Sequence, residues 1–189
     1  MLAMARKTFA DAGYVDIGMD HFALEGDALA VAKRQGRLHR NFQGYSTQPD
    51  CDLIGLGVSA IGKIGPTYSQ NHKTLEAYYD AIGNGQLPVM QGLALTRDDL
   101  ARRAVIMSLM CQGNVQFESI ELGHMLAFPA YFARELDTMR DFERSGLVTL
   151  SGQGIDVTDA GWTFIRAIAM TFDRYLQADR SRASFSRIL

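Results

Sequence analysis

Residue types able to support chemistry gather in two short stretches of the first half of the chain. Asp20 and His21 are adjacent ionisable residues directly after an apolar stretch, and residues 39–45 (HRNFQGY) place hydrogen-bond donors, acceptors and aromatic rings within seven positions. Ionisable groups at the end of a strand are candidate ligand contacts in α/β folds, and a structural hydrogen-bonded pair is an equal alternative. The second stretch suits a polar, planar or adenine-containing ligand, or it is a solvated loop that tucks two rings into the core. These stretches supply the candidate pocket residues Asp20, His21, Arg40, Asn41 and Tyr45.

Two further patterns stop short of a known chemistry. Residues 57–64 (GVSAIGKI) depart from a phosphate-binding loop at Ile64, where the loop needs the magnesium-binding hydroxyl of Ser or Thr. Cys51 and Cys111 form no CxxC pair, and the four histidines form no HxxxH motif. We therefore predict no metal site built from this chain alone, and no catalytic residue is assigned.

The elements that position these residues fall into two parts, 1–95 and 96–189, with a boundary near residue 95. The first part is α/β and the second is mainly helical. In the first part we predict helices over residues 3–12, 27–35 and 74–82, and strands over residues 13–19 and 52–61. The second strand is continuously apolar, which is typical of a strand buried on both faces of a parallel sheet. Such a short sheet has unpaired edges, so the first part resembles the end of a larger fold.

The second part has the order helix, helix, hairpin, helix, which is winged-helix-like. Thr96 caps the first helix, which ends near Gly113, and the spacing of apolar residues predicts the second over residues 128–142. Residues 147–157 form the hairpin, and Thr158 caps the last helix. This part can serve as a stand-alone interaction module that binds protein or nucleic acid, which is the alternative to an enzymatic role.

The composition is that of an ordinary globular protein, with 47% hydrophobic residues, 21% charged residues and a net charge of −2. No window approaches the roughly 18 uninterrupted apolar residues of a membrane span. The first residues lack the apolar core of a secretory signal, so we expect a cytoplasmic protein with no membrane partner. The balanced charge disfavours nucleic acid as a partner, because phosphate binding needs clustered Lys and Arg.

Five segments, in order along nearly all of the 189 residues, form a recognisable set. They are GYVDIGMDHFAL, GRLHRNFQGYSTQPDCDLIGLGVSAIG, LALTRDD, GLVTL followed by IDVT, and FSRIL. Together these segments resemble the oxygen-independent coproporphyrinogen III oxidase family of radical S-adenosylmethionine enzymes. The stretch HRNFQGY also separates the chain from the related haem chaperones of the same superfamily.

The resemblance implies a particular reaction and particular cofactor contacts. Members of the family cleave S-adenosylmethionine reductively at a 4Fe–4S cluster and convert coproporphyrinogen III to protoporphyrinogen IX without oxygen. The Phe and Gln of NFQGY lie beside a second S-adenosylmethionine in the family, which carries over to Phe42 and Gln43. The isoleucine of GVSAI contacts the cluster-bound S-adenosylmethionine, which carries over to Ile61. An apolar contact there helps to keep water from the reacting group.

The chain departs from the family at the cluster, whose CxxxCxxC ligand motif is absent. We therefore expect the C-terminal portion of such an enzyme: the end of an incomplete (β/α) radical-SAM barrel followed by a helical, winged-helix-like module. Its partner would be the N-terminal half of the barrel. Alone, the chain is expected to be inactive and to self-associate through unpaired strand edges and uncovered apolar faces.

Overall fold

The computed structural model describes residues 2–178, and these form two compact units. The main unit joins Met1–Thr47 to Ala101–Leu189, and the small unit is Gln48–Leu100. The segment FSRIL lies outside the described residues. In the described part of the chain, no helix is both long and apolar enough to cross a membrane.

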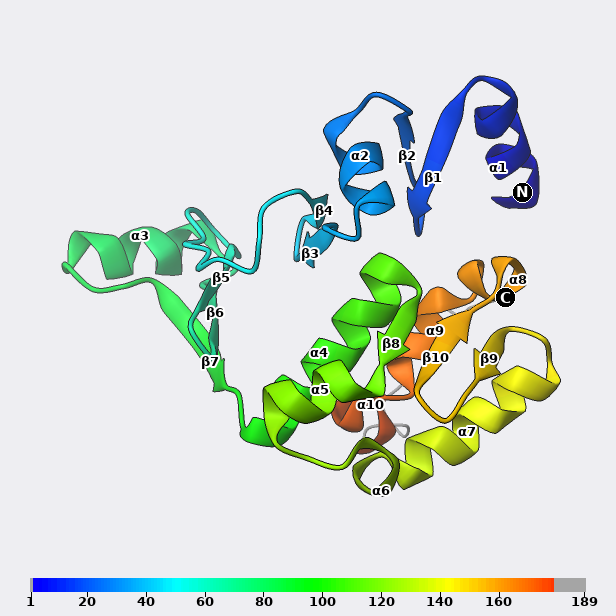
Figure 1. Ribbon diagram of the computed structural model, residues 1–189. Helices are drawn as coiled ribbons and strands as arrows, with labels where there is room; N and C mark the ends of the chain where they lie inside the picture. Colours follow the sequence, from blue (N-terminus) through cyan, green and yellow to red (C-terminus); the bar gives the residue numbers. More distant parts are fainter. Residues whose placement is uncertain (1, 179–189) are drawn as a thin grey trace. The chain divides into compact units, whose positions relative to one another are not determined.

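The N-terminal segment of the main unit consists of two hairpins and two helices (Figure 1). The hairpins are β1 with β2 and β3 with β4, both antiparallel. The elements are α1 (Leu2–Asp11), β1 (Tyr14–Gly18), β2 (His21–Leu24), α2 (Ala28–Arg34), β3 (His39–Asn41) and β4 (Gly44–Ser46). Asp27 caps α2 by accepting a hydrogen bond from the amide of Leu29 at 2.8 Å, which satisfies one of the free donors of the first helical turn.

The C-terminal segment of the main unit is largely helical around one three-stranded antiparallel sheet, in the order β8-β10-β9. Its elements are α4 (Arg97–Gln112), β8 (Asn114–Gln116), α5 (Phe117–His124), α6 (Phe128–Tyr131), α7 (Ala133–Arg144), β9 (Val148–Leu150), β10 (Gly154–Val157), α8 (Asp159–Trp162), α9 (Ile165–Met170) and α10 (Arg174–Ala178). The first residues of α4 belong to the small unit. Thr96 lies before α4, and Thr96 and Asp99 form reciprocal hydrogen bonds that satisfy the start of this helix.

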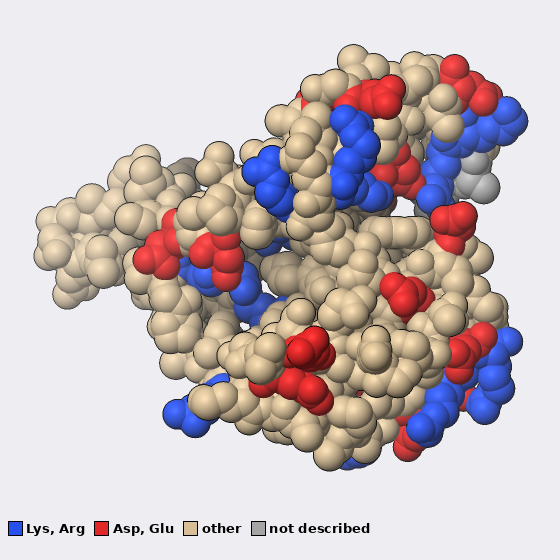
Figure 2. Space-filling view, in the orientation of Figure 1, with Lys and Arg blue, Asp and Glu red and all other residues tan. Residues whose placement is uncertain are grey.

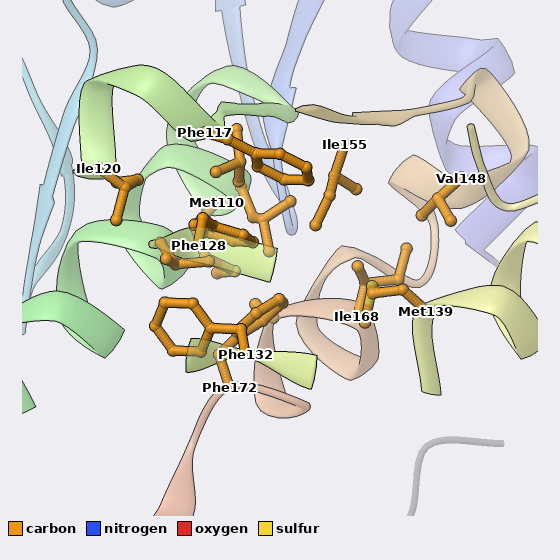
Figure 3. Close-up of a cluster of buried hydrophobic side chains, with 14 of the residues drawn as sticks. Met110, Phe117, Ile120, Phe128, Phe132, Met139, Val148, Ile155, Ile168 and Phe172 are labelled. Atoms are coloured by element: carbon orange, nitrogen blue, oxygen red, sulfur yellow. The ribbon is translucent and has the colours of Figure 1, made fainter. Parts of the chain in front are cut away.

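The larger core of the main unit is built on aromatic side chains from α5, from α6, and from the short connections that follow α6 and α9 (Figure 3). Phe128 stacks on Phe117 with ring centroids 4.2 Å apart, and it lies 4.7 Å from Phe132. Phe132 meets Phe172 edge to face at 5.5 Å. Because Phe128, Phe132 and Phe172 are fully buried, these contacts fix the helices around the sheet.

Direct contacts join the two segments of the main unit. The hydroxyl of Tyr45 donates a hydrogen bond to the carbonyl of Met110 at 2.9 Å, and the amide of Gln112 donates one to the carbonyl of Leu38 at 3.2 Å. In addition, Arg6 donates a hydrogen bond to the Thr163 hydroxyl at 2.8 Å, and Lys33 lies 4.4 Å from the centre of the Trp162 ring. The hairpins are thus fixed to the helical segment through both side chains and backbone.

The small unit holds a three-stranded antiparallel sheet, β5 (Ile61–Ile64), β6 (Thr67–Asn71) and β7 (Val89–Ala94), with α3 (Leu75–Gly83) between β6 and β7 in the chain. Among its described residues, no apolar side chain is fully buried. Ile54, Leu56 and Leu87 are 73%, 85% and 83% exposed. Such a surface is unusual for a free-standing fold, because apolar area gains stability only when it leaves water.

The predicted strand over residues 52–61 is wrong. Leu53 makes one bridge to Lys63, and regular strand structure begins only at Ile61. The reason is the backbone of this glycine-rich segment: Gly57 and Ser59 adopt φ of +102° and +60°, which extended strands do not tolerate. The segment is held as a loop by the Asn71 amide, which donates hydrogen bonds to the carbonyls of Gly55 and Gly57 at 3.2 and 2.9 Å.

The mixed α/β class is confirmed, but the predicted end of a parallel barrel is not. The described residues form four small antiparallel sheets and no closed barrel. Tight reversals, such as the turn at Phe42 and Gln43 or the one at Gly65 and Pro66, pair β3 with β4 and β5 with β6 as antiparallel sequence neighbours. β7 pairs antiparallel with β6 after the connection that contains α3. The last predicted helix is divided into α8, α9 and α10.

Candidate functional site

The turn between β3 and β4 presents the two residues that the resemblance assigns to S-adenosylmethionine. Phe42 and Gln43 form the tip, and Phe42 is 50% exposed. The Asn41 side chain fixes the tip by accepting a hydrogen bond from the backbone N–H of Gln43 at 2.9 Å. Asn favours local turns of this kind. The hairpin therefore exposes Phe42 and Gln43 on a short, defined turn.

Tyr45 is the side chain around which the site is organised. It is 9% exposed, and its hydroxyl binds the carbonyl of Met110 on α4. The His21 ring meets the Tyr45 ring edge to face at 5.3 Å, and the Arg40 guanidinium carbon lies 4.8 Å from the centre of the same ring. Arg40 and Tyr45 are direct partners across β3 and β4, so they share a face of the hairpin. Three of the predicted pocket residues are therefore brought together.

The β1–β2 turn that carries Asp20 and His21 has an uncommon backbone. Gly18, Met19 and Asp20 have φ of +139°, +49° and +113°, and positive φ is unfavourable for residues other than glycine. A β-carbon on Gly18 would come 2.5 Å from the Tyr45 hydroxyl, so this glycine lets the turn pass the tyrosine. Strained backbone of this kind concentrates at functional sites, and here it sets the position of His21.

Asp20 points to a different place from His21. It lines a cavity of about 220 Å³ between the β1–β2 turn and the start of α9, together with Arg6, Asp16 and Trp162. Arg6 is paired with Asp16 at 2.7 Å in its wall. Asp20 and His21, which were predicted as one site, thus lie in two different environments. Asp20 lines this cavity, whereas His21 packs against Tyr45.

Burial changes the proton affinity of two groups in the site. Burial raises the pKa of Tyr45 to about 12, opposed by the nearby Arg40 charge. Burial also raises the pKa of Cys111 to about 11, again opposed by Arg40 and by Arg103. Both groups are therefore protonated at neutral pH, and the thiol is a poor nucleophile or metal ligand.

Ile61 lies in the small unit as the first residue of β5 and is half-buried. Its backbone passes very close to Gly55, where a β-carbon would come 2.7 Å from the Ile61 carbonyl oxygen. Gly55 therefore has to be glycine for the loop over residues 53–57 to follow β5. The side chain is available for the apolar contact that the resemblance implies.

Sequence reasoning did not place Cys111 or Met110 in the site. It also missed Gly18 and Gly44, whose lack of a side chain leaves room for the rings of Tyr45 and His21. Gly44, with φ of +134°, would place a β-carbon 2.9 Å from His21 Nε2. The signal for Gly44 was present in the motif FQGY, because a tight hairpin turn favours glycine. Cys111 lies on a helix far along the chain, and its place beside Tyr45 follows only from tertiary packing.

The described residues do not fit an iron–sulfur cluster. Among them no group of three or more His, Cys, Asp or Glu side chains is placed to hold a metal ion. The cysteines Cys51 and Cys111 belong to different units, and a 4Fe–4S cluster needs several thiolates at one place. For S-adenosylmethionine the fit is better, since an exposed ring and an adjacent amide suit an adenine.

The helix that precedes the β9–β10 hairpin carries charges of both signs. On α7, Arg140 pairs with Asp137 and Arg144 pairs with Asp141, each one turn apart. Figure 2 shows basic and acidic side chains next to each other over this part of the face in view. Such pairing differs from the row of cations with which proteins track phosphates.

Comparison with known proteins gives the class first. Residues 95–164 match the family described as the HemN C-terminal domain. The solved structure "Coproporphyrinogen III oxidase (HemN) from Escherichia coli is a Radical SAM enzyme" superposes with a TM-score of 0.90 and 47% sequence identity, over 93% of this chain and 40% of that chain. The fold is therefore that of the C-terminal portion of a radical SAM enzyme.

Curated relatives give the particular family. The chain is 45% identical over its whole length to an oxygen-independent coproporphyrinogen III oxidase of Synechocystis, covering 42% of that protein. It is 47% identical to the Pseudomonas aeruginosa protein of the same name, again over its whole length and 41% of the relative. The chain corresponds to the C-terminal portion of oxygen-independent coproporphyrinogen III oxidase, which confirms the resemblance. It spans about two-fifths of the length of these relatives.

Proposed function

We propose that this chain forms the C-terminal part of the active-site wall of an oxygen-independent coproporphyrinogen III oxidase. Such an enzyme decarboxylates coproporphyrinogen III oxidatively to protoporphyrinogen IX in haem biosynthesis. The observation that carries the proposal is the β3–β4 turn, which exposes Phe42 and Gln43 at its tip in a chain related over its full length to these oxidases. By itself the chain is expected to be inactive, because its described residues do not fit the cluster.

Each residue then has a distinct task. The Phe42 ring stacks on the adenine of an S-adenosylmethionine, and the Gln43 amide reads a polar edge of the same ligand. Ile61 supplies an apolar contact that keeps water from the reacting group. S-adenosylmethionine, when bound, supplies the hydrogen-removing chemistry that turns a propionate side chain into a vinyl group with loss of carbon dioxide. The part of this chain is to bind, orient and shield.

A chimera tests the proposal. This chain would replace the corresponding C-terminal portion of the Pseudomonas aeruginosa relative, and anaerobic formation of protoporphyrinogen IX would be measured after cluster reconstitution. We expect the chimera to be active. Phe42→Ala should lower kcat/KM by about tenfold or more, since aromatic–base stacking contributes about 1–3 kcal/mol.

The matched control removes another exposed ring. Tyr79 on α3 is 64% exposed, and Tyr79→Ala should leave the rate unchanged. A folded, cluster-loaded chimera without activity would refute the proposed function. Equal rates for Phe42→Ala and Tyr79→Ala would refute the role of the turn.

A further inference from the structure

Two hydrogen-bonding atoms beside Tyr45 are buried without a partner. Within the described residues, Nη1 of Arg40 and Nδ1 of His21 are the buried side-chain nitrogen or oxygen atoms that make no hydrogen bond. Buried polar atoms are satisfied in the large majority of folded proteins, and each exception calls for a physical explanation. Both side chains flank the same tyrosine ring next to the Phe42–Gln43 turn: the Arg40 guanidinium carbon lies 4.8 Å from the centre of the Tyr45 ring, and the centre of the His21 ring lies 5.3 Å from it.

The charge of Arg40 is also without a carboxylate. In the described part of the chain no acidic side chain forms an ion pair with Arg40, and its neighbours are the ring and hydroxyl of Tyr45 and the thiol of Cys111. By contrast, Arg6 pairs with Asp16 and Arg102 pairs with Glu135. A half-buried guanidinium held on an aromatic ring is desolvated, oriented and available to an anion.

We propose that Arg40 and His21 form a carboxylate-binding subsite beside the β3–β4 turn. This inference rests on the proposed function, because both of its ligands carry the required group. S-adenosylmethionine has an amino-acid carboxylate, and coproporphyrinogen III has propionates. The guanidinium donates to the carboxylate oxygens in the paired geometry that arginine favours, and Nδ1 of His21 donates as the N–H tautomer.

Access to the subsite needs only side-chain movement. Arg40 and His21 are half-buried as residues, although the two unpaired atoms are covered. The ring of Tyr45 is held in place, because its hydroxyl is bound to α4 at 2.9 Å.

The test is a binding titration of the full chain followed by NMR of the Arg40 and His21 side chains. The probes are S-adenosylmethionine, its decarboxylated analogue, coproporphyrin III and glutarate. Arg40→Gln should weaken binding of a carboxylate probe by about tenfold, and Arg40→Lys by less, since lysine keeps the charge but loses the planar fork. His21→Gln keeps a polar atom near the position of Nε2 and removes Nδ1, so it should weaken binding about threefold.

The matched control is Arg37→Gln, which removes an equal charge from an exposed arginine just before β3. It should bind every probe as the unaltered chain does. Circular dichroism of each variant shows whether it is folded. If Arg40→Gln does not fold, the shifts of Arg40 and His21 in the unaltered chain and in Arg40→Lys decide the outcome.

The two carboxylate sources give different patterns. A loss of affinity for S-adenosylmethionine but not for its decarboxylated analogue identifies the amino-acid carboxylate, and a loss for coproporphyrin III alone identifies a propionate. If glutarate shifts Arg40 while neither biological ligand binds to the chain, the subsite stands, and the activity of the chimera decides the proposed function. If S-adenosylmethionine and coproporphyrin III each bind equally to the unaltered chain, Arg40→Gln and Arg37→Gln, the subsite is refuted while the proposed function stands. No shift of Arg40 with any probe also refutes the subsite.

Discussion

Replacing Tyr45 with phenylalanine separates the hydrogen bond of its hydroxyl from the packing of its ring. The change removes the 2.9 Å bond to the carbonyl of Met110 and leaves the aromatic contacts in place. Loss of one buried hydrogen bond costs about 1 kcal/mol, so Tyr45→Phe should lower the free energy of unfolding by about that amount at pH 7.

The same variant should change how stability depends on pH. The pKa of Tyr45 is raised from 10.0 to about 12 by burial, so the folded protein holds the phenol proton more tightly than the unfolded chain does. Stability from this effect is complete below pH 10 and is lost as the pH rises from 10 to 12. Two pKa units correspond to about 2.7 kcal/mol, which exceeds the hydrogen-bond loss. The stability curves of the two proteins should therefore cross in this interval.

Urea unfolding followed by tryptophan fluorescence provides the assay, because the one tryptophan, Trp162, lies in the main unit. Cys111 and Lys33 also titrate at alkaline pH, but their contributions are common to both proteins and cancel in the difference. Tyr79→Phe alters an exposed phenol and should leave the curve unchanged. Parallel curves for the unaltered chain and Tyr45→Phe between pH 8 and about 11.5 would refute the assigned burial of this phenol.

Two further changes test other parts of the fold. Gly44→Ala places a β-carbon 2.9 Å from the His21 ring at a φ of +134°, so it should destabilise the main unit by about 1–3 kcal/mol in urea unfolding. Gly26→Ala, which meets no atom within 4 Å, is its control, and equal losses for the two would contradict the close approach. Leu56→Ser alters a side chain that is 85% exposed, so it should reduce self-association in light scattering without lowering the unfolding free energy. A monomeric unaltered chain would contradict the expectation of self-association.

The elements predicted most accurately are those with local signals. The capping residue Thr96 and the stop near Gly113 identify α4, and the helix predicted over residues 27–35 contains α2. The hairpin of β9 and β10 was likewise found from its turn residues. In these places the residues that determine the structure are adjacent in sequence, so one sequence is enough to find them.

The predictions of secondary structure fail where residues distant in sequence, or the backbone conformation of glycines, determine the element. The apolar run over residues 52–61 has the composition of a buried strand, yet its glycines allow it to form a loop. Asn71, the last residue of β6, holds this loop through two side-chain hydrogen bonds to its backbone carbonyls. The strand β6 is the central strand of its sheet, but its sequence TYSQN is polar, so the sequence pattern does not indicate a central strand. Predictions of this kind depend on partners that the local pattern does not contain.

The sequence supplied candidate residues for the site, but not their geometry. Phe42, Gln43 and Ile61 came from the family resemblance, and their roles as S-adenosylmethionine contacts stay predictions. The convergence of His21 and Arg40 on Tyr45 joins two separate hairpins, and α4 anchors that tyrosine. No spacing rule in the sequence reports such a contact.

The main unit is assembled from two stretches of chain that are separated in sequence by the whole small unit. The links between these stretches, from Tyr45 to α4 and from Lys33 to Trp162, are noncovalent and lie within the main unit. A single peptidase cut within Gln48–Leu100 therefore divides the polypeptide without dividing the main unit. The two pieces should co-elute from a size-exclusion column, and separately expressed pieces should recombine. The N-terminal segment with its two hairpins can then be isotopically labelled independently of the C-terminal helical segment.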